Sequence, residues 1–215
     1  MSKEVDQRTR VASLLRELGH EFVSHELDNE TLIRLATAVE GLLALVSSNP
    51  ARIRGGSSGS LETFRSSIPV HGSGEPRHLF ADSIVSGGSN PLGLGAYLWR
   101  DGDHAVMEVT LGPAFEGAPG RAHGGIVAAL IDETMGLVLS IHGTMALTAQ
   151  LDISYRAATP VNVPIMARAW LESQEGRKMR MRCEVSAGGD PLAEATSLFI
   201  AIDPSRFHAT ESPLA

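Results

Sequence analysis

The sequence predicts an α+β fold in which an antiparallel sheet wraps around one long central helix, with a helical extension before it. Three observations carry this prediction. Segments toward the C-terminus alternate apolar and polar side chains, an apolar run of helical length precedes them, and residues 8–47 show helical periodicity. A period of two places one strand face in a core and the other in water, which is typical of antiparallel sheets.

The helical extension is predicted at residues 8–18 and 30–47. Asp28 or Asn29 can cap the second helix through its side-chain oxygen. Apolar residues in that helix recur at spacings of three and four, namely Leu32, Leu35, Val39, Leu42 and Val46. We expect this amphipathic pair to pack on the main domain or on a partner subunit.

The domain boundaries follow from composition. A Gly- and Ser-rich stretch after the second helix is typical of a linker, and the segment after it is rich in Pro, Gly, Ser and His, as expected for irregular cover. We therefore predict a helical extension over 1–50, a linker and cover segment over 51–81, the main domain over 82–205 and a tail over 206–215.

Five strands are predicted in the main domain, one before the central helix and four after it: 104–112, 148–156, 164–173, 177–187 and 192–202. The clearest apolar row is Met179, Met181, Cys183 and Val185. In 148–156, strict alternation places Ala149, Leu151, Ile153 and Tyr155 on the buried face.

The central helix, 124–142, carries two adjacent acids, Asp132 and Glu133, between apolar residues. A buried carboxylate without a partner costs several kcal/mol, so each acid needs a structural partner or a chemical task. Two central charges also disfavour insertion into a bilayer, which favours a core helix and no transmembrane segment. Because the helix is apolar nearly all round, we expect a curved sheet on three sides and a second subunit on the fourth.

The start of this helix has the features of an oxyanion site. Gly124 and Gly125 allow close approach to free backbone N–H groups at the positive end of the helix dipole. Asp132 lies eight residues after Gly124, or about 12 Å along the axis. One carbonyl group cannot contact both within one chain, so a shared substrate predicts two antiparallel helices in a dimer.

Composition excludes several classes of function. A net charge of −7 argues against general nucleic-acid binding. A single cysteine, Cys183, and eight scattered histidines argue against a metal cluster. The charged N-terminus, with acids among its bases, resembles neither a secretory signal nor a transit peptide, so cytoplasmic localisation is predicted.

Residues 85–203 resemble the hotdog-fold acyl-CoA thioesterases of the phenylacetate-pathway (PaaI-like) type, within the 4-hydroxybenzoyl-CoA thioesterase superfamily. The resemblance rests on His123-Gly124-Gly125 with Asp132 at the H-G-G-x(6)-D spacing. The stretches GAPGRAHGG, LTAQLDISYR, EGRK and EATSLFIAI look especially like the mammalian mitochondrial branch.

The resemblance implies roles for the motif residues. Asp132 matches the general base or nucleophile, and Gly124 the amide that polarises the thioester carbonyl. His123 matches the histidine that orients this loop, and Thr148 a residue that helps to hold the attacking water. Several relatives have Asn where this chain has Gly117, so any contact from that side chain is missing.

Substrate-binding residues are predicted around this motif. Gly125 and Glu133 are predicted to bind the substrate, with Glu133 a helper or a dimer contact rather than the base. Arg156, Arg177 and Lys178 could hold the phosphates of coenzyme A; solvated charges at strand ends are the alternative for all three.

The resemblance thus implies hydrolysis of a fatty or aromatic acyl-CoA, in lipid metabolism, by a homodimer or tetramer without a cofactor. Acyl-CoA is then the substrate. Two alternatives stay open: a non-catalytic acyl-CoA-binding or regulatory module, and an acyl-CoA hydratase.

Overall fold

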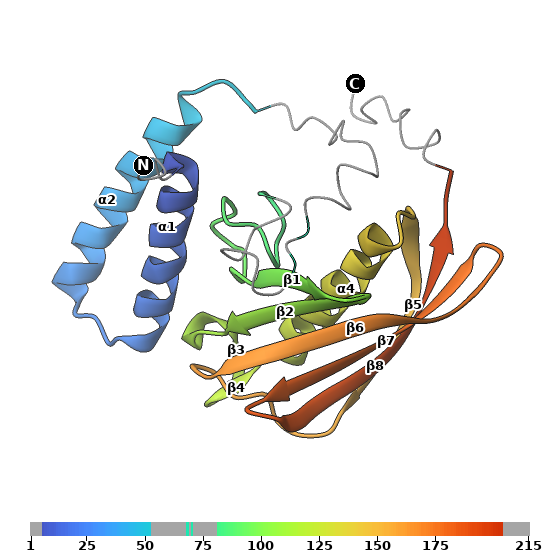
Figure 1. Ribbon diagram of the computed structural model, residues 1–215. Coiled ribbons are helices and arrows are strands. Elements are labelled where there is room, and N and C mark those ends of the chain that lie inside the picture. Colours follow the sequence, from blue (N-terminus) through green and yellow to red (C-terminus); the bar gives the residue numbers. More distant parts are fainter. Residues whose placement is uncertain (1–5, 53–67, 69, 71–80, 204–215) are drawn as a thin grey trace.

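The computed structural model describes residues 6–52, 68, 70 and 81–203 (Figure 1). The predicted linker and cover segment therefore lies mostly outside the described residues, and the predicted tail lies wholly outside them. The described chain forms a curved sheet with one helix on its concave side and a helical hairpin beside it.

The main sheet of the described residues has six antiparallel strands in the order β1-β2-β6-β7-β8-β5. Their bounds are Tyr97–Asp101 (β1), His104–Thr110 (β2), Ala146–Tyr155 (β5), Pro164–Glu175 (β6), Lys178–Ala187 (β7) and Asp190–Ala201 (β8). A short second sheet pairs Glu116–Ala118 (β3) with Arg121–Ala122 (β4), just after the 3-10 turn Pro113–Phe115 (η1).

The five predicted strands are confirmed, and their apolar rows form the core. In β7, Met179, Met181, Cys183 and Val185 are all buried. Strand β1 was not predicted from the sequence; it is short and buries only Leu98 completely. A turn at Gly102, with φ of +60°, joins β1 to β2.

Helix α4, Gly124–Ile141, matches the predicted central helix. Of the helices in the described chain, only α4 is long and apolar enough to cross a membrane by length and composition. The core helix of a globular domain passes the same test, and nine residues of α4 are buried. One face is not surrounded in the single chain: Ala128, Asp132 and Gly136 are half-buried and Gly125 is exposed.

Strand β5 lies at the edge of the sheet and returns along α4, so one of its edges has no partner strand among the described residues (Figure 1). The predicted buried row in β5 was partly wrong. Leu151 and Ile153 are half-buried, but Ala149 and Tyr155 are exposed. An edge strand in a single chain has less cover, which explains the exposure.

The extension forms two helices, α1 (Gln7–Ser24) and α2 (Asn29–Ser47), and Asp28 caps α2 by accepting from the Thr31 amide at 2.7 Å. Helix α1 is six residues longer at its C-terminal end than predicted. It packs on the main domain, where Ala12 is buried. Helix α2 has no buried residue.

Candidate functional site

Asp132 lies on the open face of α4, opposite the start of β5. The Thr148 hydroxyl donates a hydrogen bond of 2.9 Å to Asp132 Oδ1. Among the described residues, no donor contacts the other oxygen, Oδ2. The carboxylate is therefore held in one orientation while one oxygen stays available to accept a proton or to attack a carbonyl carbon.

A β-bulge directs Thr148 toward this carboxylate. The register of β5 against β8 shifts between Thr148 and Gln150, so Ala149 is an extra residue. Thr148 and Tyr155 are an odd number of positions apart, and regular alternation would place them on opposite faces. With the bulge both face α4: Thr148 contacts Asp132, and Tyr155 contacts the helix N-terminus.

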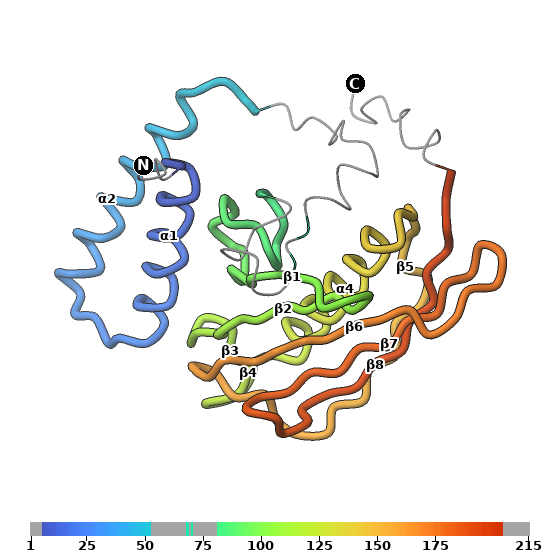
Figure 2. Tube along the Cα trace, viewed as in Figure 1, coloured from blue at the N-terminus to red at the C-terminus, as the bar shows by residue number. Residues whose placement is uncertain are grey.

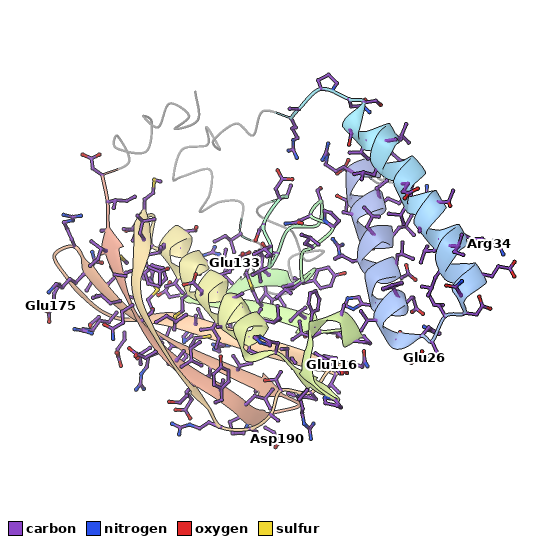
Figure 3. All side chains as sticks on the ribbon, turned by 180° about the vertical axis from the view of Figure 1, so that it is seen from behind. Glu26, Arg34, Glu116, Glu133, Glu175 and Asp190 are labelled. Carbon is purple, nitrogen blue, oxygen red and sulfur yellow. The ribbon has the colours of Figure 1, made fainter. Side chains whose placement is uncertain are left out.

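Glu133 has a different neighbourhood, because its side chain faces the segment 81–96, which we name the cover loop (Figure 3). The hydroxyls of Ser83 and Ser86 donate to its two carboxylate oxygens, one to each. The Ser86 amide adds a third hydrogen bond of 3.1 Å. Glu133 therefore ties the cover loop to α4, a role that the sequence analysis did not predict.

The first turn of α4 is held by side chains at both ends of one peptide unit. His123 is the N-cap, and its Nδ1 accepts from the Gly125 amide at 3.0 Å. The Tyr155 hydroxyl donates to the Gly124 carbonyl at 2.8 Å. Since Nδ1 is an acceptor, the neutral His123 ring carries its proton on Nε2.

The Gly124 amide itself has no acceptor among the described residues. It lies at the N-terminus of an 18-residue helix, where the dipole favours negative charge. The predicted oxyanion donor, the Gly124 amide, is thus free. Hydrogen bonds to Tyr155 and His123 fix the Gly124 carbonyl and the Gly125 amide that follow it.

An open cavity of about 390 Å³ adjoins this turn. It is lined by Arg121, Gly124, Val127, Tyr155, Arg156 and Thr159, among others. It combines an apolar wall, a free backbone donor and two arginines, which suits a ligand that carries both an apolar group and an anionic one.

Comparison with known proteins finds a similar family for the region around α4. Residues 119–194 match a family model described as the thioesterase superfamily. The region around α4 is thus similar to the thioesterase superfamily. A solved structure described as a thioesterase superfamily protein superposes with a TM-score of 0.75 at 23% identity, covering 92% of each chain. This likeness confirms the predicted hotdog fold.

Curated relatives agree with the family. Acyl-coenzyme A thioesterase THEM4 from Bos taurus is 31% identical over 136 residues, which is 61% of this chain and 56% of that protein. Acyl-coenzyme A thioesterase THEM5 from Mus musculus is 39% identical over 72 residues, covering 34% of this chain and 29% of that protein. The chain thus spans about half, or less, of the length of these relatives.

The absence of a side chain at Gly117 has a structural reason. A Cβ atom added at this position would lie 2.9 Å from His123 Cα and 3.0 Å from its ring. Such a contact is closer than carbon atoms tolerate, so an asparagine would displace the N-cap. The close packing of His123 against position 117 therefore requires a glycine there.

The predicted cationic side chains lie at two ends of the main sheet. Arg156 lines the cavity beside Gly124 but forms an ion pair of 3.2 Å with Glu194. Lys178 pairs with Ile200 on β8, whereas Tyr155, next to Arg156, pairs with Ala193. A seven-residue span of strand covers about 23 Å, so one chain does not bring Arg156 and Lys178 together.

Arg177 lies beside Lys178, and its Nε donates to the Ala201 carbonyl at 2.8 Å. Arg177 is in the β6–β7 turn and Lys178 begins β7, at the end opposite the α4 N-terminus. Their role as phosphate ligands stays a prediction that requires a second chain.

Two residues of this site were missed from the sequence. Arg121 lines the cavity, and its position directly before the motif could have suggested it. Tyr155 was assigned only to an apolar row; recognising that β5 returns along α4 would have placed its hydroxyl at the motif.

No group of three or more His, Cys, Asp or Glu residues with metal-binding geometry occurs in the part of the chain that the structure describes. Cys183 is buried, and burial raises the pKa of its thiol to about 12. A thiol with such a pKa is a poor nucleophile at neutral pH.

Proposed function

We propose that this protein is an acyl-CoA thioesterase that hydrolyses a fatty or aromatic acyl-CoA to the free acid and coenzyme A. The observation that carries the proposal is the half-satisfied carboxylate of Asp132. Its Oδ1 accepts from Thr148, and its Oδ2 has no donor among the described residues. The family-model match and the names of the similar proteins support the same activity.

In the proposed reaction, the thioester carbonyl oxygen accepts a hydrogen bond from the Gly124 amide. Asp132 takes a proton from a water molecule while the water oxygen attacks the carbonyl carbon. Alternatively, the Asp132 carboxylate attacks that carbon itself. The tetrahedral intermediate carries its negative charge beside the helix N-terminus. The C–S bond then breaks, and the coenzyme A thiolate takes up the proton that Asp132 removed from water. After direct attack, water instead hydrolyses the mixed anhydride formed on Asp132, which releases the acid and supplies the proton for the thiolate.

His123 has two tasks in this scheme. Its Nδ1 holds the Gly125 amide, and its Nε2–H is then the ring's donor for the substrate. Thr148 restrains Asp132 and can share the attacking water. The reaction requires no redox step and no cofactor.

The site is completed by a second copy of the chain in this proposal. Gly124 and Asp132 of one helix are about 12 Å apart, too far for one carbonyl group. Asp132, on the open face of α4, bonds to Thr148 of β5, the strand whose outer edge has no partner among the described residues. An antiparallel partner helix would bring its Asp132 toward this Gly124, and the partner's turn between β6 and β7 could supply cations for coenzyme A.

The test is release of free thiol from a panel of short, long and aromatic acyl-CoAs by the wild type and by Asp132→Asn. We expect hydrolysis by the wild type and loss of most activity in the variant, with the oligomeric state unchanged. Full activity in the variant would remove Asp132 from its role.

Two other results would favour the alternatives. Binding of acyl-CoA without hydrolysis would favour a non-catalytic module. Hydration of an enoyl-CoA without thiol release would favour a hydratase. Cytoplasmic localisation and a role in lipid metabolism remain predictions from the sequence.

A further inference from the structure

Helix α1 contacts the main domain through a polar and small-residue stripe. Thr9, Ala12, Arg16 and His20 recur at spacings of three and four, which places them on one helix face. Thr9 Oγ1 lies 3.1 Å from Ser89 Oγ. The apolar side chains of α1 are not the ones that make these contacts, and several are 40% exposed or more.

Arg16 and Thr9 attach α1 to the cover loop. Arg16 Nη1 donates to the Asn90 carbonyl at 2.6 Å and to the Gly88 carbonyl at 3.3 Å. The cover loop lies between α1 and α4, as Figure 2 shows in green. Its other side bonds to Glu133, so α1 is connected to the helix that carries the candidate base.

His20 attaches the C-terminal half of α1 to the segment 112–115. Its Nδ1 accepts from the Ala114 amide at 3.1 Å, and its ring meets Phe115 edge-on at 5.1 Å. A Cβ atom at Gly112 would lie 2.6 Å from His20 Nδ1. The imidazole therefore fits closely against this backbone and requires a glycine there.

The segment 112–115 in turn holds the candidate site. The Phe115 carbonyl accepts from the His123 amide at 2.8 Å. His123 is the N-cap whose ring holds Gly125 and whose neighbour, Gly124, carries the free amide. A continuous series of contacts thus runs from His20 through Phe115 to the first turn of α4.

We propose that His20 is a positioning residue for the candidate site: it fixes segment 112–115 against the first turn of α4 and thereby sets the position of the Gly124 amide. This inference rests on the proposed function for its effect on catalysis. Helix α1, outside the matched family region, then belongs to the support of the site.

The test compares three variants. His20→Ala removes the acceptor, whereas His20→Asn keeps a neutral acceptor at a similar distance from the main chain. His25→Ala is the matched control, because His25 lies at the end of the same helix and is exposed, and among the described residues its polar contacts are with Ser24 and Glu21. Amide hydrogen exchange at His123 and Leu130, and kcat and KM for the best acyl-CoA, are measured for each.

We expect His20→Ala to speed exchange of the His123 amide about 5- to 10-fold, the effect of losing one hydrogen bond. Exchange at Leu130, in the middle of α4, should not change. The same variant should lower kcat by a similar factor with KM little changed. His20→Asn should restore both values, and His25→Ala should match the wild type.

Wild-type exchange at His123 in His20→Ala would overturn the inference, as would an Asn variant as impaired as the Ala variant. If His20→Ala does not fold, His20→Asn against His25→Ala still decides, through kcat and through His123 exchange. If no acyl-CoA is hydrolysed by the wild type, the proposed function fails, and the exchange measurement alone judges the coupling.

Discussion

The two sides of α4 put adjacent carboxylates to different uses. Glu133 faces the cover loop and accepts three hydrogen bonds from Ser83 and Ser86. Asp132 faces β5 and accepts one, from Thr148. On the covered side, both oxygens of Glu133 therefore accept hydrogen bonds. On the open side, one oxygen of Asp132 has no donor among the described residues.

The difference teaches how to interpret a pair of acids in an apolar helix. A carboxylate that is fully hydrogen-bonded stabilises the contact between two segments and gains little from reacting. A carboxylate held by one bond is oriented but still able to accept a proton. One residue of helical rotation, about 100°, separates the two roles.

The largest expected effect is that of Asp132→Asn, which tests whether the open side of α4 carries the reactive acid. We expect kcat for the best acyl-CoA to fall about 10²- to 10⁴-fold, the usual contribution of a general base. Thermal unfolding should change little, since Asn can still accept from Thr148. An active Asp132→Asn variant with an unchanged pH–rate profile would show that the open side is not the reactive side.

Glu133→Gln tests the covered side. Replacing the charged acceptor should lower the free energy of unfolding by about 1.5–3 kcal/mol, the worth of hydrogen bonds to a charged group. Urea unfolding measures this loss, with Glu175→Gln, an exposed acid at the end of β6, as the control. A Glu133→Gln variant as stable as that control would contradict the structural role.

Thr148→Val sharpens the assignment on the open side. Valine keeps the shape and removes the donor to Asp132, so kcat should fall about tenfold. Thr148→Ser keeps the hydroxyl and should retain most of the activity. Equal rates for the Val and Ser variants would show that the hydrogen bond does not contribute.

The contact between His20 and segment 112–115 should depend on pH. Burial, and then the nearby Arg16 charge, lower the pKa of His20, and Glu21 opposes this effect. Segment 112–115, against which the ring packs, carries no titratable side chain. His20 must be neutral to accept from Ala114.

The sign follows from the lowered pKa. The unfolded chain takes up a proton at higher pH than the folded chain does, so the stabilisation is present above 6.5, the ordinary pKa of histidine, and is lost as pH falls through the lowered pKa of the folded state. The difference in unfolding free energy between wild type and His20→Asn should therefore shrink or reverse below that pH. A pH-independent difference would contradict it.

The smallest expected effect concerns Cys183, in the buried row of β7. With its pKa raised to about 12, the thiol should not react with an aromatic disulfide reagent at pH 8 while the protein is folded, and should react fully in denaturant. Rapid reaction of the native protein would show that this part of the core opens.

Much of the fold could be predicted because it depends on local periodicity. The alternation in 177–187 and the apolar run after His123 identify strands and the central helix without any long-range information. Strand β1 was not predicted, because only Leu98 of its five residues is completely buried. So short a segment shows no clear alternation of apolar and polar residues.

The site was predictable to the extent that its residues are close in sequence. The spacing of His123 and Asp132 indicated a helix N-terminus and a carboxylate, and both lie where expected. The contacts of Tyr155, His20 and Glu133 were not predictable, because each joins segments 31 to 94 residues apart in sequence with no spacing rule between them.

By itself the sequence determined the elements, the motif and the presence of two acids in a core helix, since these depend on hydrophobic period and on side-chain chemistry. Only the tertiary structure decided which acid is free. The bulge at Ala149 brings Thr148 to Asp132, and the cover loop occupies Glu133. Both outcomes depend on strand register and loop packing, which are set by the whole chain rather than by neighbouring residues.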